Sequence, residues 1–160
     1  DNWAANFYAR SHAALSTQVE AIVGAAEAVD ALEALGFKTA VASSGEHAKM
    51  KITLGRIGLY ERFKGRIFSA EDVAVGKPAP DVYLLAAKTL GHAPETCFAV
   101  EDSPNGARAA IAAGMTTFGY AAQIEPALLI AAGVRAVFFN MADLPGLVVT
   151  ASQEPDITLS

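Results

Sequence analysis

The sequence predicts an α/β fold in which a parallel sheet lies between two layers of helices, forming a three-layer sandwich. Short, almost wholly apolar segments alternate along the chain with segments whose apolar residues recur at helical spacing. Polar residues follow directly after several of the apolar segments. This pattern is typical of parallel sheets, which bind ligands at the carboxyl ends of their strands.

The predicted helices and strands follow one another in regular order. Helices are expected over residues 24–36, 46–63 (broken by glycines), 81–91, 104–114, 126–133 and 141–150, and strands over 37–43, 65–72, 96–102, 115–121 and 134–140. Gly36 is suited to end the first of these helices, and Asp81, which follows Pro80, is expected to be an N-cap. We expect a further helix up to about residue 15 and a loose tail over residues 151–160.

Composition limits the classes of function. A chain of 160 residues makes one domain, or one domain with a fragment of another. Its 17 acidic residues outnumber its 12 lysines and arginines, and the net charge of −5 argues against a nucleic-acid partner. We find neither a membrane-spanning run nor a signal peptide, so a cytoplasmic location without membrane contact is expected. The single cysteine, Cys97, is expected to be a buried structural thiol.

Three strand ends carry side chains of chemical interest. Ser43 and Ser44 stand at the end of the first predicted strand, Lys77 lies in the loop that follows the second strand, and the adjacent acids Glu101 and Asp102 end the third strand. Each group has an ordinary explanation: a serine turn, a solvated loop lysine, or an acidic helix N-terminus. Together they have a chemical logic, because hydroxyl and ammonium groups bind phosphate and paired carboxylates hold Mg²⁺. The set therefore predicts a magnesium-assisted site for a phosphate ester.

Other phosphate and metal sites fit the sequence poorly. A P-loop needs Ser or Thr after its Gly-Lys pair, but Pro78 follows Lys77 here. No G-x-G-x-x-G motif follows a predicted strand, which argues against a dinucleotide site. The histidines, His12, His47 and His92, lack the spacing of zinc ligands.

The ordered motifs VASSG, GKPAPD and VEDSPNGARAAIAAGM resemble those of the haloacid dehalogenase superfamily of phosphohydrolases. The similarity is greatest to the subfamily with a small helical cap, which includes β-phosphoglucomutases, phosphoglycolate phosphatases and sugar-phosphate phosphatases. It extends over about residues 20–147. The resemblance implies a Rossmann-like core with a parallel sheet, Mg²⁺ as the cofactor and a small phosphorylated metabolite as the substrate.

The resemblance also implies a role for each motif residue. Ser43 matches the hydroxyl that hydrogen-bonds the transferring phosphoryl group, and the backbone N–H of Ser44 is expected to join it. Lys77 matches the lysine that balances the charge of the nucleophile and the phosphoryl oxygens. Glu101 and Asp102 match the acids that help to hold Mg²⁺.

Two residues beyond the acid pair are expected to have supporting roles. Ser103 and Asn105 follow Glu101 and Asp102 in the same loop. They are expected to orient the acid pair or to cap the following helix rather than to bind substrate.

The sequence departs from the family in one respect. In the family, a D-x-D-G-T loop follows the first strand. Its first aspartate is the nucleophile, and its second aspartate is the general acid and base. This chain contains no D-x-D sequence. We therefore expect residues 1–20 to be a remnant of the cap and linker, and residues 21–150 a core without its first strand. Either the sequence is part of a longer protein, which we favour, or the protein is catalytically inactive. In both cases the 160-residue chain by itself is expected to be inactive and, with sheet edges uncovered, unstable or self-associating.

Four functions remain to be weighed. The favoured one is a Mg²⁺-dependent phosphatase acting on a small metabolite such as a sugar phosphate, through an aspartyl phosphate on a residue outside this chain. A phosphomutase is the first alternative, but Glu46 is poorly suited to a second phosphate. A non-enzymatic binding or regulatory domain is the second alternative. Dehalogenation needs no Mg²⁺, and the Glu101–Asp102 pair argues against it. The sequence sets neither the substrate nor the oligomeric state.

Overall fold

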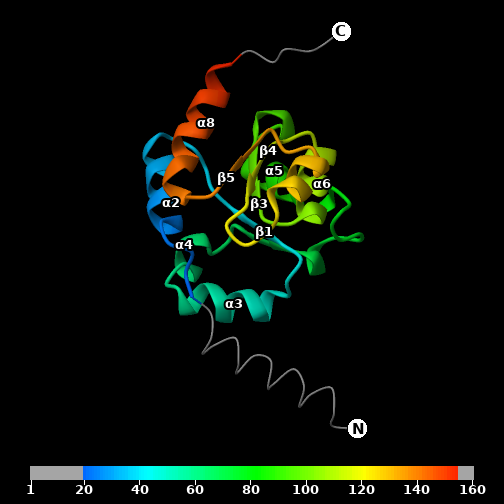
Figure 1. Cartoon of the computed structure of the whole chain (residues 1–160). Helices are drawn as coiled ribbons and strands as arrows, with labels where there is room; N and C mark the ends of the chain where they lie inside the picture. The colour runs from blue at the N-terminus through cyan, green and yellow to red at the C-terminus, as the bar shows by residue number, and fades with distance from the viewer. Residues whose placement is uncertain (1–19, 155–160) are drawn as a thin grey trace.

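The computed structural model describes residues 20–154 (Figure 1). Its α-helices are α2 (Ala25–Ala34), α3 (His47–Arg56), α4 (Tyr60–Phe63), α5 (Asp81–Leu90), α6 (Pro104–Ala112), α7 (Pro126–Ala132) and α8 (Leu144–Gln153). Its strands are β1 (Val41–Ser43), β2 (Ile67–Ser69), β3 (Phe98–Glu101), β4 (Thr116–Tyr120) and β5 (Ala136–Phe138). Three 3-10 turns complete it: η1 (Ala70–Asp72), η2 (Pro94–Thr96) and η3 (Met141–Asp143).

Among residues 20–154, all strand pairs are parallel, as the sequence predicts. The strands form two sheets, β1–β2 and β3–β4–β5, rather than one continuous sheet. In the first sheet Ser43 lies opposite Ser69, so these two strands end level with each other. In the second sheet Glu101, the last residue of β3, lies opposite Gly119. Ser43 and Glu101 thus lie at the carboxyl ends of β1 and β3, one in each sheet.

Helices α5 and α6 join the two sheets through one hydrophobic core. Phe68 of β2 and Ala99 of β3 both belong to it, together with the buried faces of the two helices. The α6 face is made of small side chains, and Ala109 and Ala110 are fully buried. Such small residues let the helix lie close to the sheet.

Helices α2 and α8 cover another part of the sheet with a second core (Figure 1). Leu32 of α2 and Val148 of α8 pack there with Phe118 and Phe138 of β4 and β5. Phe98 packs against this core, whereas its neighbour Ala99 belongs to the core under α5 and α6. Since neighbouring strand residues point to opposite faces, the helices cover both sides of the sheet, and the three-layer prediction is confirmed.

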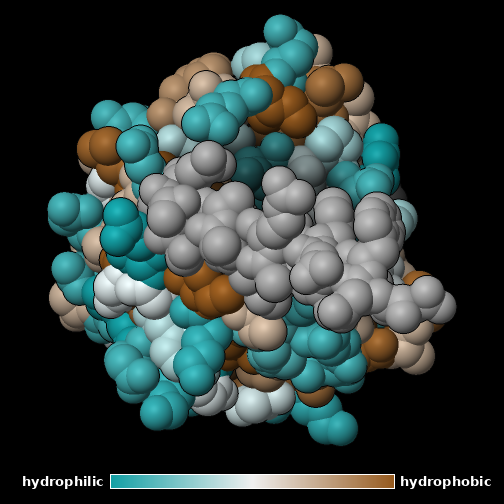
Figure 2. Space-filling view, turned by 90° about the horizontal axis from the view of Figure 1, so that it is seen from below, coloured by the Kyte–Doolittle hydropathy of each residue, from teal (hydrophilic) through white to brown (hydrophobic). Residues whose placement is uncertain are grey.

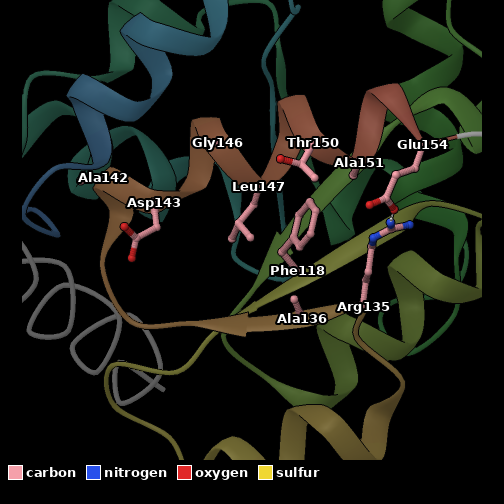
Figure 3. A pocket seen from close by; sticks show the side chains of 10 residues that line it. All are labelled: Phe118, Arg135, Ala136, Ala142, Asp143, Gly146, Leu147, Thr150, Ala151 and Glu154. Atoms are coloured by element: carbon pink, nitrogen blue, oxygen red, sulfur yellow. Dashed lines mark hydrogen bonds and ion pairs between the residues drawn. The ribbon is translucent and has the colours of Figure 1, made fainter.

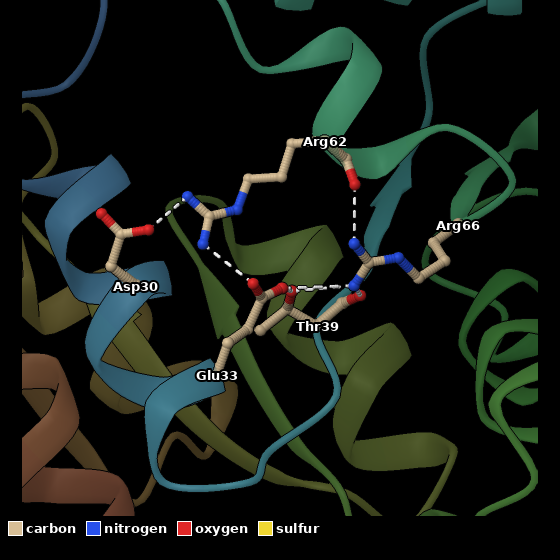
Figure 4. Close-up of polar contacts among 5 residues, drawn as sticks. All are labelled: Asp30, Glu33, Thr39, Arg62 and Arg66. Atoms are coloured by element: carbon tan, nitrogen blue, oxygen red, sulfur yellow. Dashed lines mark hydrogen bonds and ion pairs between the residues drawn. The ribbon is translucent and has the colours of Figure 1, made fainter.

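A polar network connects α2 to the segments that lead into β1 and β2 (Figure 4). Glu33 of α2 accepts hydrogen bonds from Thr39, from Arg62 Nη2 at 2.8 Å and from Arg66 Nη1 at 3.2 Å. Arg62 also pairs with Asp30 at 2.6 Å. The contacts of Glu33 lower its pKa from 4.5 to about 2. The hydrogen bond from Thr39 has the largest effect, followed by the hydrogen bond from Arg62.

Some local predictions differ from the structure. Asp81 is the first residue of α5 and Pro80 occupies the N-cap position, without a side-chain cap, so the N-cap prediction is wrong. Helix α8 continues to Gln153, into the segment expected to be a loose tail. The predictions for residues 1–15 and 155–160 lie outside the described residues.

Cys97 is only partly buried, with its Sγ 3.4 Å from the carbonyl oxygen of Ala93. Desolvation raises the pKa of its thiol. At neutral pH the thiol therefore stays protonated, and the prediction that Cys97 is buried is wrong, because the residue remains partly exposed.

The outer surface is mixed in character. Figure 2 shows the face near α3, where hydrophobic side chains appear as separate patches among hydrophilic ones outside the grey area. Among the described residues, no helix has the length and apolar character needed to cross a membrane.

Candidate functional site

The site is built around Lys77, whose ammonium joins the carboxyl ends of β1 and β3. Its Nζ donates to the carbonyl oxygen of Ala42 in β1 at 3.1 Å and to Glu101 Oε1 at the end of β3. The side chains of Lys77 and Glu101 are 9% and 8% exposed. A buried carboxylate is costly unless a partner charge lies beside it, and Lys77 is that partner.

Tyr83 completes this cluster. Its hydroxyl donates to Glu101 Oε1, and its oxygen accepts a hydrogen bond from Lys77 Nζ at 3.2 Å. The same Nζ lies 4.7 Å from the centroid of the Tyr83 ring. Burial, and then the charge of Glu101, raise the pKa of the Tyr83 hydroxyl, so it remains a neutral donor. Sequence reasoning missed Tyr83, and the only signal was an aromatic residue in the helix that follows Lys77.

The other oxygen of Glu101 is enclosed by the start of α6. Ser103 lies with its hydroxyl 3.4 Å from Glu101 Oε2 and, as the N-cap of α6, accepts a hydrogen bond from the backbone N–H of Gly106 at 3.1 Å. A Cβ atom at Gly106 would lie 1.9 Å from Glu101 Oε2. The capping role expected of Ser103 is thus confirmed, and the glycine leaves the space that the carboxylate fills.

Asp102 differs from its neighbour because it is exposed. Within residues 20–154, no cluster of three or more histidine, cysteine or acidic side chains could hold a metal ion. The residues present fit part of a Mg²⁺ site. Asp102 offers a carboxylate of the kind Mg²⁺ prefers, whereas Glu101 Oε1 is already engaged by Lys77 and Tyr83.

The predicted phosphate-binding serines lie beside this cluster. Ser43 directly follows Ala42, the residue whose carbonyl oxygen binds Lys77. The Ser43 hydroxyl accepts a hydrogen bond from the backbone N–H of Gly45 at 3.0 Å, which makes a tight turn, and Ser44 is exposed on that turn. The structure thus brings Ser43, Lys77 and Glu101 to one edge of the fold.

Hydrogen bonds connect the turn after β1 to the turn after β2. Ser69 is fully buried, and its hydroxyl donates to the carbonyl oxygen of Gly45 at 2.7 Å. Glu71 accepts from the backbone N–H of His47 at 2.7 Å, and the carboxylate of Asp72 lies 2.8 Å from the His47 ring. Hydrogen bonds from the Ser69 backbone and then from His47 lower the pKa of Asp72. These contacts fix the backbone of the serine turn.

A separate cavity of about 520 Å³ lies between α8 and the strands β4 and β5 (Figure 3). Phe118, Ala136 and Leu147 line its apolar part, and Arg135 pairs with Glu154 at one side of it. None of the residues predicted for the phosphate site lines this cavity. The candidate phosphate site at the strand ends is therefore distinct from this cavity.

The comparisons with known proteins agree on one family. A family model described as haloacid dehalogenase-like hydrolase matches residues 3–114. The chain is 31% identical over 131 residues to the 6-phosphogluconate phosphatase of Escherichia coli (strain K12), a match that covers 82% of this chain and 58% of that protein. It is 37% identical over 97 residues to hexitol phosphatase A of the same strain, covering 60% of this chain and 44% of that protein. The chain thus spans about half the length of these relatives.

A solved structure supports the same grouping. A HAD family hydrolase from Deinococcus radiodurans R1, determined with bound phosphate and sodium, superposes with a TM-score of 0.83 at 33% identity. The superposition covers 94% of this chain and 68% of that one. The superposition thus covers more of this chain than the sequence match to the 6-phosphogluconate phosphatase, which covers 82% of it.

Proposed function

Because the chain belongs to the haloacid dehalogenase-like hydrolase family, we propose that it forms the phosphate-binding part of a Mg²⁺-dependent phosphatase. The proposed substrate is a small phosphorylated metabolite such as a sugar phosphate. The 6-phosphogluconate and hexitol phosphatases among its relatives support this substrate class. The observation that carries the proposal is the buried Lys77 ammonium, which contacts Ala42 and Glu101, the residues that directly precede Ser43 and Asp102 in the chain.

Each residue has a defined task in this proposal. Lys77, whose three N–H groups have acceptors within the protein, supplies positive charge near the phosphoryl group, and the Ser43 hydroxyl and the Ser44 backbone N–H donate hydrogen bonds to that group. Asp102 would hold Mg²⁺, which neutralises phosphate charge when bound. Glu101 is the remaining predicted metal residue, and its contacts favour a task in holding Lys77.

The nucleophile is proposed to come from outside this chain. In the family pattern an aspartate of a D-x-D-G-T loop attacks phosphorus, forming an O–P bond as the bond to the alcohol oxygen breaks. Water then hydrolyses the aspartyl phosphate and releases inorganic phosphate. The task of the residues in this chain is to bind and orient the phosphoryl group during both steps.

Turnover of p-nitrophenyl phosphate by the full-length protein tests this proposal. We expect hydrolysis in the presence of Mg²⁺ and its loss on addition of EDTA. Absence of turnover, or turnover that EDTA leaves unchanged, would contradict it. Formation of glucose 6-phosphate from β-glucose 1-phosphate would instead identify a phosphomutase.

A further inference from the structure

The Lys77 ammonium has three N–H groups, and each has one acceptor in the protein. A lysine ammonium donates up to three hydrogen bonds and accepts none. The acceptors are the carbonyl oxygen of Ala42 at 3.1 Å, the hydroxyl oxygen of Tyr83 at 3.2 Å, and Glu101 Oε1. Since the Lys77 side chain is only 9% exposed, water has little access to replace any of them.

Tyr83 is the acceptor that contacts both members of the ion pair. Its oxygen accepts from Lys77 while its own O–H donates to Glu101 Oε1. A single phenol group thereby contacts both the ammonium and the carboxylate. The ring adds a further restraint, because Lys77 Nζ lies 4.7 Å from its centroid.

We propose that Tyr83 is a positioning residue whose hydroxyl holds the Lys77 ammonium in place between β1 and β3. The importance of Tyr83 for phosphate binding rests on the proposed function. The hydrogen bonds of Tyr83 with Lys77 and Glu101 are independent of that function. The alternative is that Tyr83 only fills space, since its ring is part of the core under α5 and α6. Phenylalanine would then serve equally well.

The variant Tyr83→Phe separates these two roles because it keeps the ring and removes only the hydroxyl. We would label the lysines of the full-length protein with isotopes and measure by NMR how fast the Lys77 ammonium protons exchange with water. In the unaltered chain this exchange should be slower than that of the exposed Lys64. In Tyr83→Phe it should become about fivefold faster, as expected for one lost hydrogen bond.

Tyr60→Phe is the matched control. Lys51 Nζ lies 5.9 Å from the centroid of the Tyr60 ring, so this tyrosine also faces a lysine, but one outside the site. Exchange at Lys77 should be unchanged in this variant. A melting temperature close to that of the unaltered chain would show that Tyr83→Phe is folded.

Two results would overturn the proposal. One is an unchanged Lys77 exchange rate in folded Tyr83→Phe, which would leave Tyr83 with a packing role only. The other is that, in the unaltered protein, the Lys77 ammonium protons exchange as fast as those of Lys64. This second result can be obtained even if Tyr83→Phe does not fold. Because neither measurement needs turnover, an inactive full-length protein would contradict the proposed function and leave this inference intact.

Discussion

At the scale of single residues, the adjacent acids Glu101 and Asp102 lie in different surroundings, which reduces the repulsion between their charges. Glu101 turns into the protein, where Lys77 balances its charge and Tyr83 and Ser103 surround its oxygens. Asp102 is exposed, so water screens its charge. One acid therefore organises the site, and the other is available to an incoming cation.

Replacing Lys77 should cost much more stability than replacing an exposed lysine. Lys77→Met leaves the Glu101 carboxylate buried without its counter-charge, and we expect a loss of about 3–5 kcal/mol in the free energy of unfolding. Lys64→Met is the control, because Lys64 and its partner Glu61 are 66% and 78% exposed. It should change stability by about 0.5 kcal/mol or less. Equal urea midpoints for the two variants would contradict a stabilising Lys77–Glu101 pair.

Gly106→Ala tests the close approach of α6 to Glu101. The new Cβ would lie 1.9 Å from Glu101 Oε2, so either the helix or the carboxylate has to move. We expect a loss of about 2 kcal/mol or more in thermal or urea unfolding. Gly146→Ala in α8 meets nothing within 4 Å and should instead stabilise the chain by about 0.5–1 kcal/mol. Similar effects of the two substitutions would contradict the packing described at Gly106.

The position of the candidate site residues near strand ends could be predicted from the sequence, but the contacts between their side chains could not. Short motifs place Ser43, Lys77 and Asp102 at or near strand ends, and strand ends of a parallel sheet meet at one edge. The direct contact of Lys77 with Glu101 depends on side-chain directions across 24 residues of chain. Tyr83 was missed for the same reason, since its part in the site follows from α5 lying against both sheets.

At the scale of elements, the network around Glu33 connects α2 to the segments before β1 and β2, and its contribution to stability depends on pH. Its pKa is about 2 in the folded protein, lowered from 4.5, so the folded state favours the charged form. The resulting stability is fully present above pH 4.5 and is lost as the pH falls towards 2. With a partly exposed side chain, we expect it to amount to about 2 kcal/mol.

The variant Glu33→Gln measures this contribution. It should be less stable than the unaltered chain at pH 7 and should lose less stability between pH 4.5 and pH 2. Glu61→Gln, which alters an exposed glutamate, should follow the unaltered chain throughout. If the free energy of unfolding changed with pH in the same way for Glu33→Gln and for the unaltered chain, the result would contradict a stabilising role of ionised Glu33.

The order of strands and helices follows from the apolar pattern, whereas their limits do not. The strand predicted over residues 37–43 is observed only as Val41–Ser43, because these are the residues that lie opposite β2. The preceding residues have other contacts: Phe37 packs in the core under α2, and Thr39 bonds to Glu33. Pairing partners set strand limits, and a single sequence does not reveal them.

At the scale of the whole molecule, the notable feature is the interruption between β1 and β3. Both are edge strands of their own sheets among the described residues, yet Lys77 contacts both of them. The resemblance to the family predicts a further strand with the nucleophile loop, and this interruption is where we propose that it lies. Unpaired strand edges of this kind favour association between molecules.

Self-association of the 160-residue chain should therefore depend on these edges. We expect sedimentation velocity to show species larger than the monomer that increase with protein concentration. Val100→Lys places a charge on β3, where the valine is 36% exposed, and should reduce them. A monomer at all concentrations would contradict the role of the open edges.

The most direct test of the central claim is the effect of Asp102→Asn on Mg²⁺-dependent hydrolysis of p-nitrophenyl phosphate by the full-length protein. Asp143→Asn is the matched control, because Asp143 is also exposed but lines the cavity beside α8. We predict that Asp102→Asn lowers kcat/KM about 100-fold or more, with unfolding unchanged, and that Asp143→Asn has no effect. Full activity of Asp102→Asn would contradict a phosphatase site at this edge of the fold.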